Sequence, residues 1–254
     1  MAINTNTQKQ TSKNRNAEET KSFMEKAYNQ AEQELEKYLK KMNKTDKQIR
    51  ELMETANFAY QIEKTSKDYE SAERFLVIAV FSMLNDEDEW LEDLIDNFFD
   101  EMFEEIVEYF GYFVDNEEKQ KILNRKYEGK TYKQRIQSNM AKINNRTKKR
   151  LKIAYNKKNL YNIASWLTPR QKMSRKRARG ILISELSRIA NDIFIYCNRD
   201  KKFMYCSVLE ERTCSDCESM HGTILTAEEA YDLIPQHNFC KCYFIVIRLS
   251  LIHI

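Results

Sequence analysis

Only four glycines and two prolines interrupt the 254 residues of this chain. Ordinary proteins contain about 7% Gly and 5% Pro, and these are the residues that most often end helices and form turns. A chain with so few of them has few places to change direction, so the sequence predicts long helices. Its length allows one sizeable domain or two smaller ones.

Apolar residues recur every three or four positions in the first part of the chain, which is the period of one helix face. This stripe predicts one amphipathic helix over residues 17–41 and a second over 45–62. Thr45 with Gln48 three positions later is a helix-start signal, so we expect the two helices to form a hairpin. Residues 1–17 are polar without periodicity and are expected to be a disordered tail.

Four or five further helices are expected in the middle of the chain. A nearly continuous apolar run at 71–84 predicts a buried helix. The acidic run that starts at Asp86 is expected to open an amphipathic helix that ends at Gly111. After a less apolar stretch that can form one or two helices, Thr168 and Pro169 resemble the N-cap and first position of another long helix.

Charge is divided into two adjacent blocks. Residues 85–118 contain fifteen acidic residues and no Lys or Arg, whereas residues 119–179 contain twenty-one basic residues and one acid, Glu128. The two blocks can pair as antiparallel neighbours, or the basic block can form a surface for nucleic acid or an acidic partner. The candidate nucleic-acid-binding residues are Lys142, Arg146, Lys148, Lys149, Arg150, Lys152, Arg175, Lys176, Arg177 and Arg179.

The pattern changes near the C-terminus. Residues 201–214 and 242–252 are rich in aromatic and β-branched residues and predict strands, and Thr226 is expected to cap a two-turn helix between them. The expected fold class is therefore α+β, with a helical region at 18–170 and a small α+β module at 171–254. A module of that size commonly needs additional stabilisation, such as a structural metal ion or disulfide bonds.

Four of the six cysteines and two of the three histidines lie together in this module. Cys214 and Cys217 form a C-x-x-C pair, and His237, Cys240 and Cys242 form H-x-x-C-x-C. Two such half-sites can complete a tetrahedral Zn²⁺ site, with Cys214, Cys217, His237 and Cys240 as first choice and Cys242 as the alternate. Unliganded or redox-active thiols and disulfides are the other interpretations.

The surroundings of these residues favour metal over disulfides. The first sixteen residues lack the apolar core of a secretory signal, and no apolar run is long enough to span a membrane, so we expect a soluble protein in a reducing compartment. His221 is expected to be a hydrogen-bonding residue of a turn. Cys197 and Cys206 are expected to be packing residues of a helix end and a strand.

A closed site with four protein ligands leaves no coordination position for a substrate. We therefore expect that the protein is not an enzyme. An HNH-type nuclease is the enzyme alternative, because it also combines paired cysteines with histidines, and His237 followed by Asn238 invites the comparison. It would need a further His after Cys242, and the chain offers only His253. No phosphate-binding Gly-rich loop or nucleophile elbow is present.

The segment at residues 203–247 resembles the C-terminal signature of the Mu F-like phage head morphogenesis family, the minor head proteins of tailed phages. There an aromatic strand leads into D-E-R-T-C-x-x-C, then an x-D-G turn, a Pro before a His, and H-P-N-C-R-C. Residues 209–217, His221-Gly222, Pro235 and 237–242 correspond here. The helix at residues 179–191 also looks like the Arg-rich helix of that family.

The sequence departs from the signature at the turns. His221 stands where the family usually has Asp, Gln236 replaces a second Pro, and Asn238-Phe239 replaces Pro-Asn. The resemblance covers about residues 175–247.

The resemblance implies a minor capsid protein present in few copies in the virion, after assembly in the host cytoplasm. It implies contact with portal and capsid proteins and a role in head assembly or DNA packaging and ejection, with neither membrane nor small-molecule substrate as partner. The basic block suits non-specific contact with double-stranded DNA. The rival is a zinc-containing nucleic-acid-binding regulator, which would need a basic helix positioned by the metal, whereas the basic block precedes the cysteines.

Overall fold

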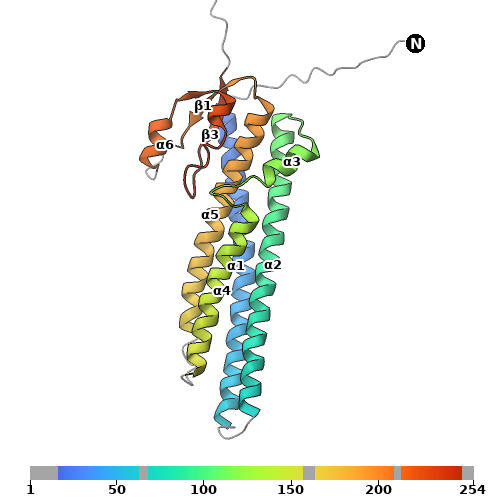
Figure 1. Cartoon of the computed structure of the whole chain (residues 1–254), viewed down its shortest axis with the longest axis vertical. Helices are drawn as coiled ribbons and strands as arrows, with labels where there is room; N and C mark the ends of the chain where they lie inside the picture. The colour runs from blue at the N-terminus through green and yellow to red at the C-terminus, as the bar shows by residue number, and fades with distance from the viewer. Residues whose placement is uncertain (1–16, 63–67, 157–163, 209–212, 248–254) are drawn as a thin grey trace, which may run out of the picture. The chain divides into compact units, whose positions relative to one another are not determined.

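The computed structural model describes residues 17–62, 68–156, 164–208 and 213–247. Within them, long helices come first and a small sheet follows, which confirms the α+β class (Figure 1). The helices of the first part are α1 (Ala17–Ile62), α2 (Asp68–Phe110), α3 (Asn116–Leu123), α4 (Tyr132–Asn156) and α5 (Ala164–Cys197). The last part contains β1 (Lys202–Cys206), α6 (Ser215–Met220), β2 (Ile224–Leu225), α7 (Ala227–Ala230) and β3 (Tyr243–Ile247). None of the described helices has a stretch both long and apolar enough to cross a bilayer.

Helix α1 is continuous, so the hairpin expected around Thr45 is wrong. Thr45 is buried, and its Oγ1 donates to the carbonyl O of Lys41, 3.2 Å away, instead of capping a new helix. The buried stripe continues from Leu35 through Met42 to Ile49, with no Gly or Pro between them. A threonine that bonds back to the preceding turn is compatible with a helix interior, so the start signal was misleading.

Helix α2 likewise joins two segments that the sequence divides. The acidic run expected to open a helix lies in its middle, where Glu87 is 1% exposed and accepts a hydrogen bond from the hydroxyl of Tyr38 at 3.5 Å. The predicted end of the helix is confirmed. Gly111 has a φ of 64°, in the left-handed region that favours glycine, and the N–H of Tyr112 bonds to the carbonyl O of Val107 at 2.8 Å.

The basic block forms most of α3, all of α4 and the first half of α5. Thr131 and Gln134 make a capping box at the start of α4, in which each side chain accepts a hydrogen bond from the backbone N–H of the other. Helix α5 begins at Ala164, so the start expected at Thr168 is one turn too late. Pro169 therefore lies in the second turn, where the missing N–H removes one helical hydrogen bond.

The chain forms two compact units, each built from separate stretches. The first, the bundle unit, comprises Asn29–Phe98 and Arg125–Leu182. Its parts of α1, α2, α4 and α5 lie side by side, and successive helices run in opposite directions (Figure 1). Their apolar stripes form the core, which includes Leu35, Tyr38, Met42 and Ile49 of α1, Leu84, Leu91 and Ile95 of α2, Ile136, Met140 and Ile143 of α4, and Ala178 and Leu182 of α5.

The second, the sheet unit, comprises the described residues of Met1–Tyr28, Phe99–Asn124 and Ile183–Ile254. The strand order is β2-β1-β3, and both neighbours of β1 run antiparallel to it, with Tyr205 paired to Phe244. Aromatic rings connect the helices to the sheet. The centroid distances are 5.7 Å from Phe110 to Phe194, 6.1 Å from Phe194 to Phe203 and 6.0 Å from Phe203 to Phe244.

The short helix α7 begins as the sequence predicts. Thr226 is its N-cap, and Thr226 and Glu229 form a capping box. The helix is a single turn, shorter than the two turns expected. The chain then passes through a loop that holds His237, Cys240 and Cys242 before it enters β3.

Candidate metal centre

The C-x-x-C pair lies at the start of α6. Cys214 is the N-cap residue, and its Sγ accepts a hydrogen bond from the backbone N–H of Cys217 at 3.3 Å. Ser, Thr, Asp and Asn usually occupy this position, so here a thiol takes the place of the capping oxygen. Cys217 is 2% exposed. The helix start thus brings both sulfur atoms to one place, one of them buried.

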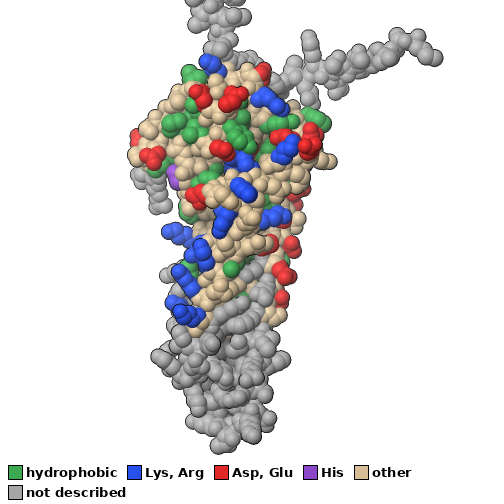
Figure 2. Space-filling model, viewed as in Figure 1, with side chains coloured by type: hydrophobic (Ala, Val, Ile, Leu, Met, Phe, Trp, Pro, Cys, Tyr) green, Lys and Arg blue, Asp and Glu red, His purple; other side chains and the backbone are tan. Residues whose placement is uncertain are grey.

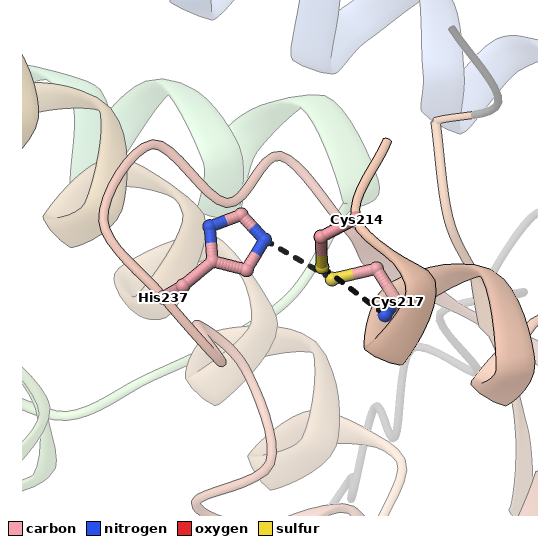
Figure 3. A group of neighbouring side chains, drawn as sticks. All are labelled: Cys214, Cys217 and His237. Carbon is pink, nitrogen blue, oxygen red and sulfur yellow. Dashed lines mark hydrogen bonds between the residues drawn. The ribbon is translucent and has the colours of Figure 1, made fainter. Parts of the chain in front are cut away.

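His237 faces this pair from the loop before β3 (Figure 3). Its Nε2 lies 3.3 Å from the Sγ of Cys217, and its Nδ1 lies 2.8 Å from the carbonyl O of Asn238. A carbonyl oxygen can only accept, so Nδ1 carries the proton of this hydrogen bond. In the neutral ring, Nε2 then holds the lone pair, and it is the nitrogen that faces the thiols.

Two groups of three donors share one residue. The ligand atoms of Cys214, Cys217 and His237 lie within 4.8 Å of one another, and so do those of Cys217, Cys240 and Cys242. Because Cys217 belongs to both groups, the five residues form a single cluster, which we call the Cys/His cluster. Such a cluster could hold a metal ion. The choice of Cys240 over Cys242 as the fourth ligand stays a prediction.

The protons of the cluster are shared unequally among its thiols. Burial raises the pKa of Cys217 to about 11, and the charge of Cys240 adds to the effect. The hydrogen bond that Cys240 receives from the Cys242 thiol lowers the pKa of Cys240 to about 5, while the same bond and burial raise the pKa of Cys242. Closely spaced thiols cannot all ionise unless a positive charge lies nearby. A divalent cation supplies that charge.

The other described cysteines and the other described histidine lie outside the cluster. The Nδ1 of His221 accepts from the backbone N–H of Ser207 at 3.2 Å, as expected for a hydrogen-bonding residue of a turn. Cys197 ends α5 and Cys206 ends β1, and burial raises their pKa values to about 12 and about 11, respectively. Cys206 is buried, whereas Cys197 is only partly buried, so a packing role stays a prediction. His253, the residue that a nuclease interpretation would need, lies outside the described residues.

The candidate nucleic-acid-binding residues lie on α4 and α5 of the bundle unit. On α4, the exposed ones are Lys142, Arg146, Lys149 and Arg150, whereas the side chains of Lys148 and Lys152 lie outside the described part. None of these four exposed residues forms an ion pair with another described residue. Figure 2 shows Lys and Arg side chains along one side of the visible face, over α4 and α5, and acidic side chains on the other side, over α2.

On α5 the basic residues are mostly engaged. Arg175 pairs with Glu36 of α1 at 3.1 Å, and Arg179 pairs with Glu32 of α1. Arg177 donates to the carbonyl O of Asn139, 3.2 Å away on α4. Lys176 is exposed. These arginines therefore join neighbouring helices and are less available to a partner than the α4 residues.

Among the described residues, the acidic and basic blocks make contact near the start of the basic block. In the sheet unit, Lys119 bonds to Asp100 at 2.7 Å and to Glu104 at 2.5 Å. In the bundle unit, Lys133 of α4 pairs with Asp96 of α2. Pairing of the two blocks as antiparallel neighbours thus accounts for the start of the basic block, and the exposed residues farther along α4 are left for another role.

Three polar residues of α5 lie beside the cluster, although no pattern in the sequence marks them. Ser184, Ser187 and Asn191 are buried and bond to the backbone of residues 239–244. Their spacing of three and then four positions places them on one helix face. In the sequence, such a polar stripe has the same pattern as a helix face exposed to solvent. Only the position of the loop against α5 distinguishes the two cases.

Comparison of the chain with protein-family models, with curated proteins and with solved structures finds no match.

Proposed function

We propose that the chain is a structural minor head protein of a tailed phage, with a Zn²⁺ ion in the Cys/His cluster that stabilises the sheet unit. One observation carries the proposal. The cysteines and the histidine of the motif that resembles the Mu F-like signature come from two separate segments, and their donor atoms form two adjacent groups of three that share Cys217. A metal ion bound by both segments would require their donor atoms to lie close together.

The donor set fits zinc. Thiolate sulfur and imidazole nitrogen are the donors of structural Zn²⁺ sites, which are tetrahedral and closed. Four of the five protein donors fill the coordination sphere, so the ion braces the fold and does not bind substrate. Metal binding in such sites contributes folding free energy, which a sheet of three short strands needs. The protein then acts by binding and assembly, and it is not an enzyme.

Non-specific contact with packaged DNA is the second part of the proposal. Lys142, Arg146, Lys149 and Arg150 follow one another along α4 with exposed side chains and no described acidic partner. Lys and Arg near phosphates release counterions whatever the base sequence, so such a row of charges suits a DNA backbone. The exposed residues of α4, and not the paired arginines of α5, would make this contact.

Particle composition tests the proposal. The full chain, carrying an affinity tag, is expressed in the host that bears its gene, and particles are purified on a density gradient and analysed by mass spectrometry. We expect the chain in the particle fraction together with a portal protein, and we expect a chain truncated after Asn198 to be absent from it. Recovery of the intact chain only outside particles would contradict the assignment.

A further inference from the structure

The second half of α5 is buried on every side, although it is rich in polar residues. Every residue from 183 to 195 is buried, and Ser184 and Ser187 are 0% exposed while Asn191 is 3% exposed. Polar side chains in such a place are costly unless their hydrogen bonds are made. These three residues lie on one face of the helix. Asn191 Nδ2 donates to the carbonyl O of Ser187 in the preceding turn at 2.7 Å, and all three side chains also bond to one neighbouring segment.

That neighbour is the backbone of the loop that holds His237, Cys240 and Cys242 before β3, which we call the ligand loop. Ser184 Oγ accepts from the N–H of Phe239 at 3.0 Å, next to Cys240. Ser187 Oγ and Asn191 Nδ2 both donate to the carbonyl O of Cys242, each at 3.1 Å. Two of the candidate ligands are therefore held through their own or the adjacent peptide group.

Asn191 also aligns the start of β3. Its Oδ1 accepts from the N–H of Phe244 at 2.9 Å while its Nδ2 donates to the carbonyl O of Cys242. These two backbone groups flank Tyr243, and one residue of a neighbouring parallel strand would bond to the same pair through its N–H and its C=O. The side-chain amide thus replaces one more strand at this point and fixes the direction in which Cys242 leaves the loop.

The loop also contains a backbone conformation that needs support. Phe239 has a φ of 68°, in the left-handed region that residues other than glycine and asparagine rarely adopt. The bond to Ser184 is made by the N–H of this same residue. Residues held in such conformations persist only when their surroundings fix them. Helix α5 supplies that support directly before Cys240.

We propose that Ser184, Ser187 and Asn191 are positioning residues that set the affinity of the cluster for its metal ion. They hold Cys240 and Cys242 beside Cys217, so that this part of the site is formed before the ion binds. A preformed site avoids the entropy of ordering the loop during binding. The inference rests on the metal-binding part of the proposed function.

The test measures the affinity of the full chain for Zn²⁺ by competition with a chromophoric chelator under reducing conditions. We expect Asn191→Ala and Ser187→Ala to bind Zn²⁺ about 10–100-fold more weakly than the parent, as removal of the partners around metal ligands commonly does. The matched control is Asp192→Asn. Asp192 is equally buried on α5, and it bonds to Arg188 of the same helix. Its affinity for Zn²⁺ should equal that of the parent.

Titration with Co²⁺ gives a second readout, because cobalt–thiolate absorption reports the geometry of the bound thiols. Ser184→Ala removes the hydrogen bond to the loop with the least change in volume, and it serves if Asn191→Ala does not fold. Affinities equal to the parent in folded Ser184→Ala and Ser187→Ala would overturn the inference, and so would an equal decrease in Asp192→Asn. A parent chain that binds neither metal would instead show that the metal site itself is wrong.

Discussion

The Nε2 of His237 lies 3.3 Å from the Sγ of Cys217, although the two residues are 20 positions apart. Cys217 belongs to α6, whereas His237 lies in the loop before β3. A metal ion bound to both would close the intervening chain, which contains β2 and α7, into a loop. Closing that loop is how a single ion would stabilise the small module.

We expect the purified full chain to contain about one equivalent of zinc, since the two groups of three donors share Cys217 and four of the five donors would complete one tetrahedral site. Cys217→Ser and His237→Ala should release the metal and lower the melting temperature of the protein. Metal analysis and circular dichroism under reducing conditions would measure both effects. His221→Ala is the matched control, because His221 is a neighbouring histidine outside the cluster. Zinc retained by both cluster variants would contradict the site.

Continuity of α1 can be tested with proline. Lys44 is exposed in the helix, so Lys44→Pro keeps the core but removes one helical hydrogen bond and clashes with the preceding turn. We expect a decrease of about 3 kcal/mol or more in the free energy of unfolding, measured with urea. Asn116→Pro, at the first position of α3 after the N-cap Asp115, should be tolerated. If Lys44→Pro were equally harmless, α1 would be interrupted there.

Arg188 is buried with two carboxylates. Its guanidinium bonds to Glu185 at 2.6 Å, to Asp192 at 2.8 Å and to the carbonyl O of Ile122 at 2.7 Å. Arg188→Met leaves buried negative charges without their cation, so we expect the free energy of unfolding in urea to fall by about 3–5 kcal/mol.

The companion variant removes the charges together with the arginine. Adding Glu185→Gln and Asp192→Asn to Arg188→Met should recover part of that stability, because amides carry no charge to desolvate. A triple variant less stable than Arg188→Met would indicate that shape, and not charge, dominates at this place.

The basic face of α4 should bind DNA without sequence preference. Changing Lys142, Lys149 and Arg150 to Glu should weaken binding and reduce the salt slope by about 0.9 for each phosphate that the variant no longer neutralises. Fluorescence anisotropy at several salt concentrations would measure this. The control changes Lys40, Lys44 and Lys47 of α1 to Glu, which alters the net charge equally. Equal weakening in both variants would mean that net charge alone drives binding.

Part of the fold follows directly from local patterns. The scarcity of Gly and Pro predicts long helices, Gly111 ends α2, and Thr226 caps α7, all as the structure has them. Local patterns also misled at Thr45, because the same residue can cap a new helix or bond back to Lys41 within an existing one. The outcome depends on whether the buried stripe continues, which is a matter of packing.

The sequence by itself determined that Cys214, Cys217, His237, Cys240 and Cys242 are the candidate metal ligands, since their spacing and chemistry are local properties of the chain. Tertiary structure alone decided that Cys217 joins the two groups of donors and that Ser184, Ser187 and Asn191 bond to the ligand loop. A polar residue on a helix has the same sequence signature whether water or a buried backbone group satisfies its hydrogen bonds. Only the packing of the loop against α5 distinguishes a solvent face from a face that supports a candidate metal site.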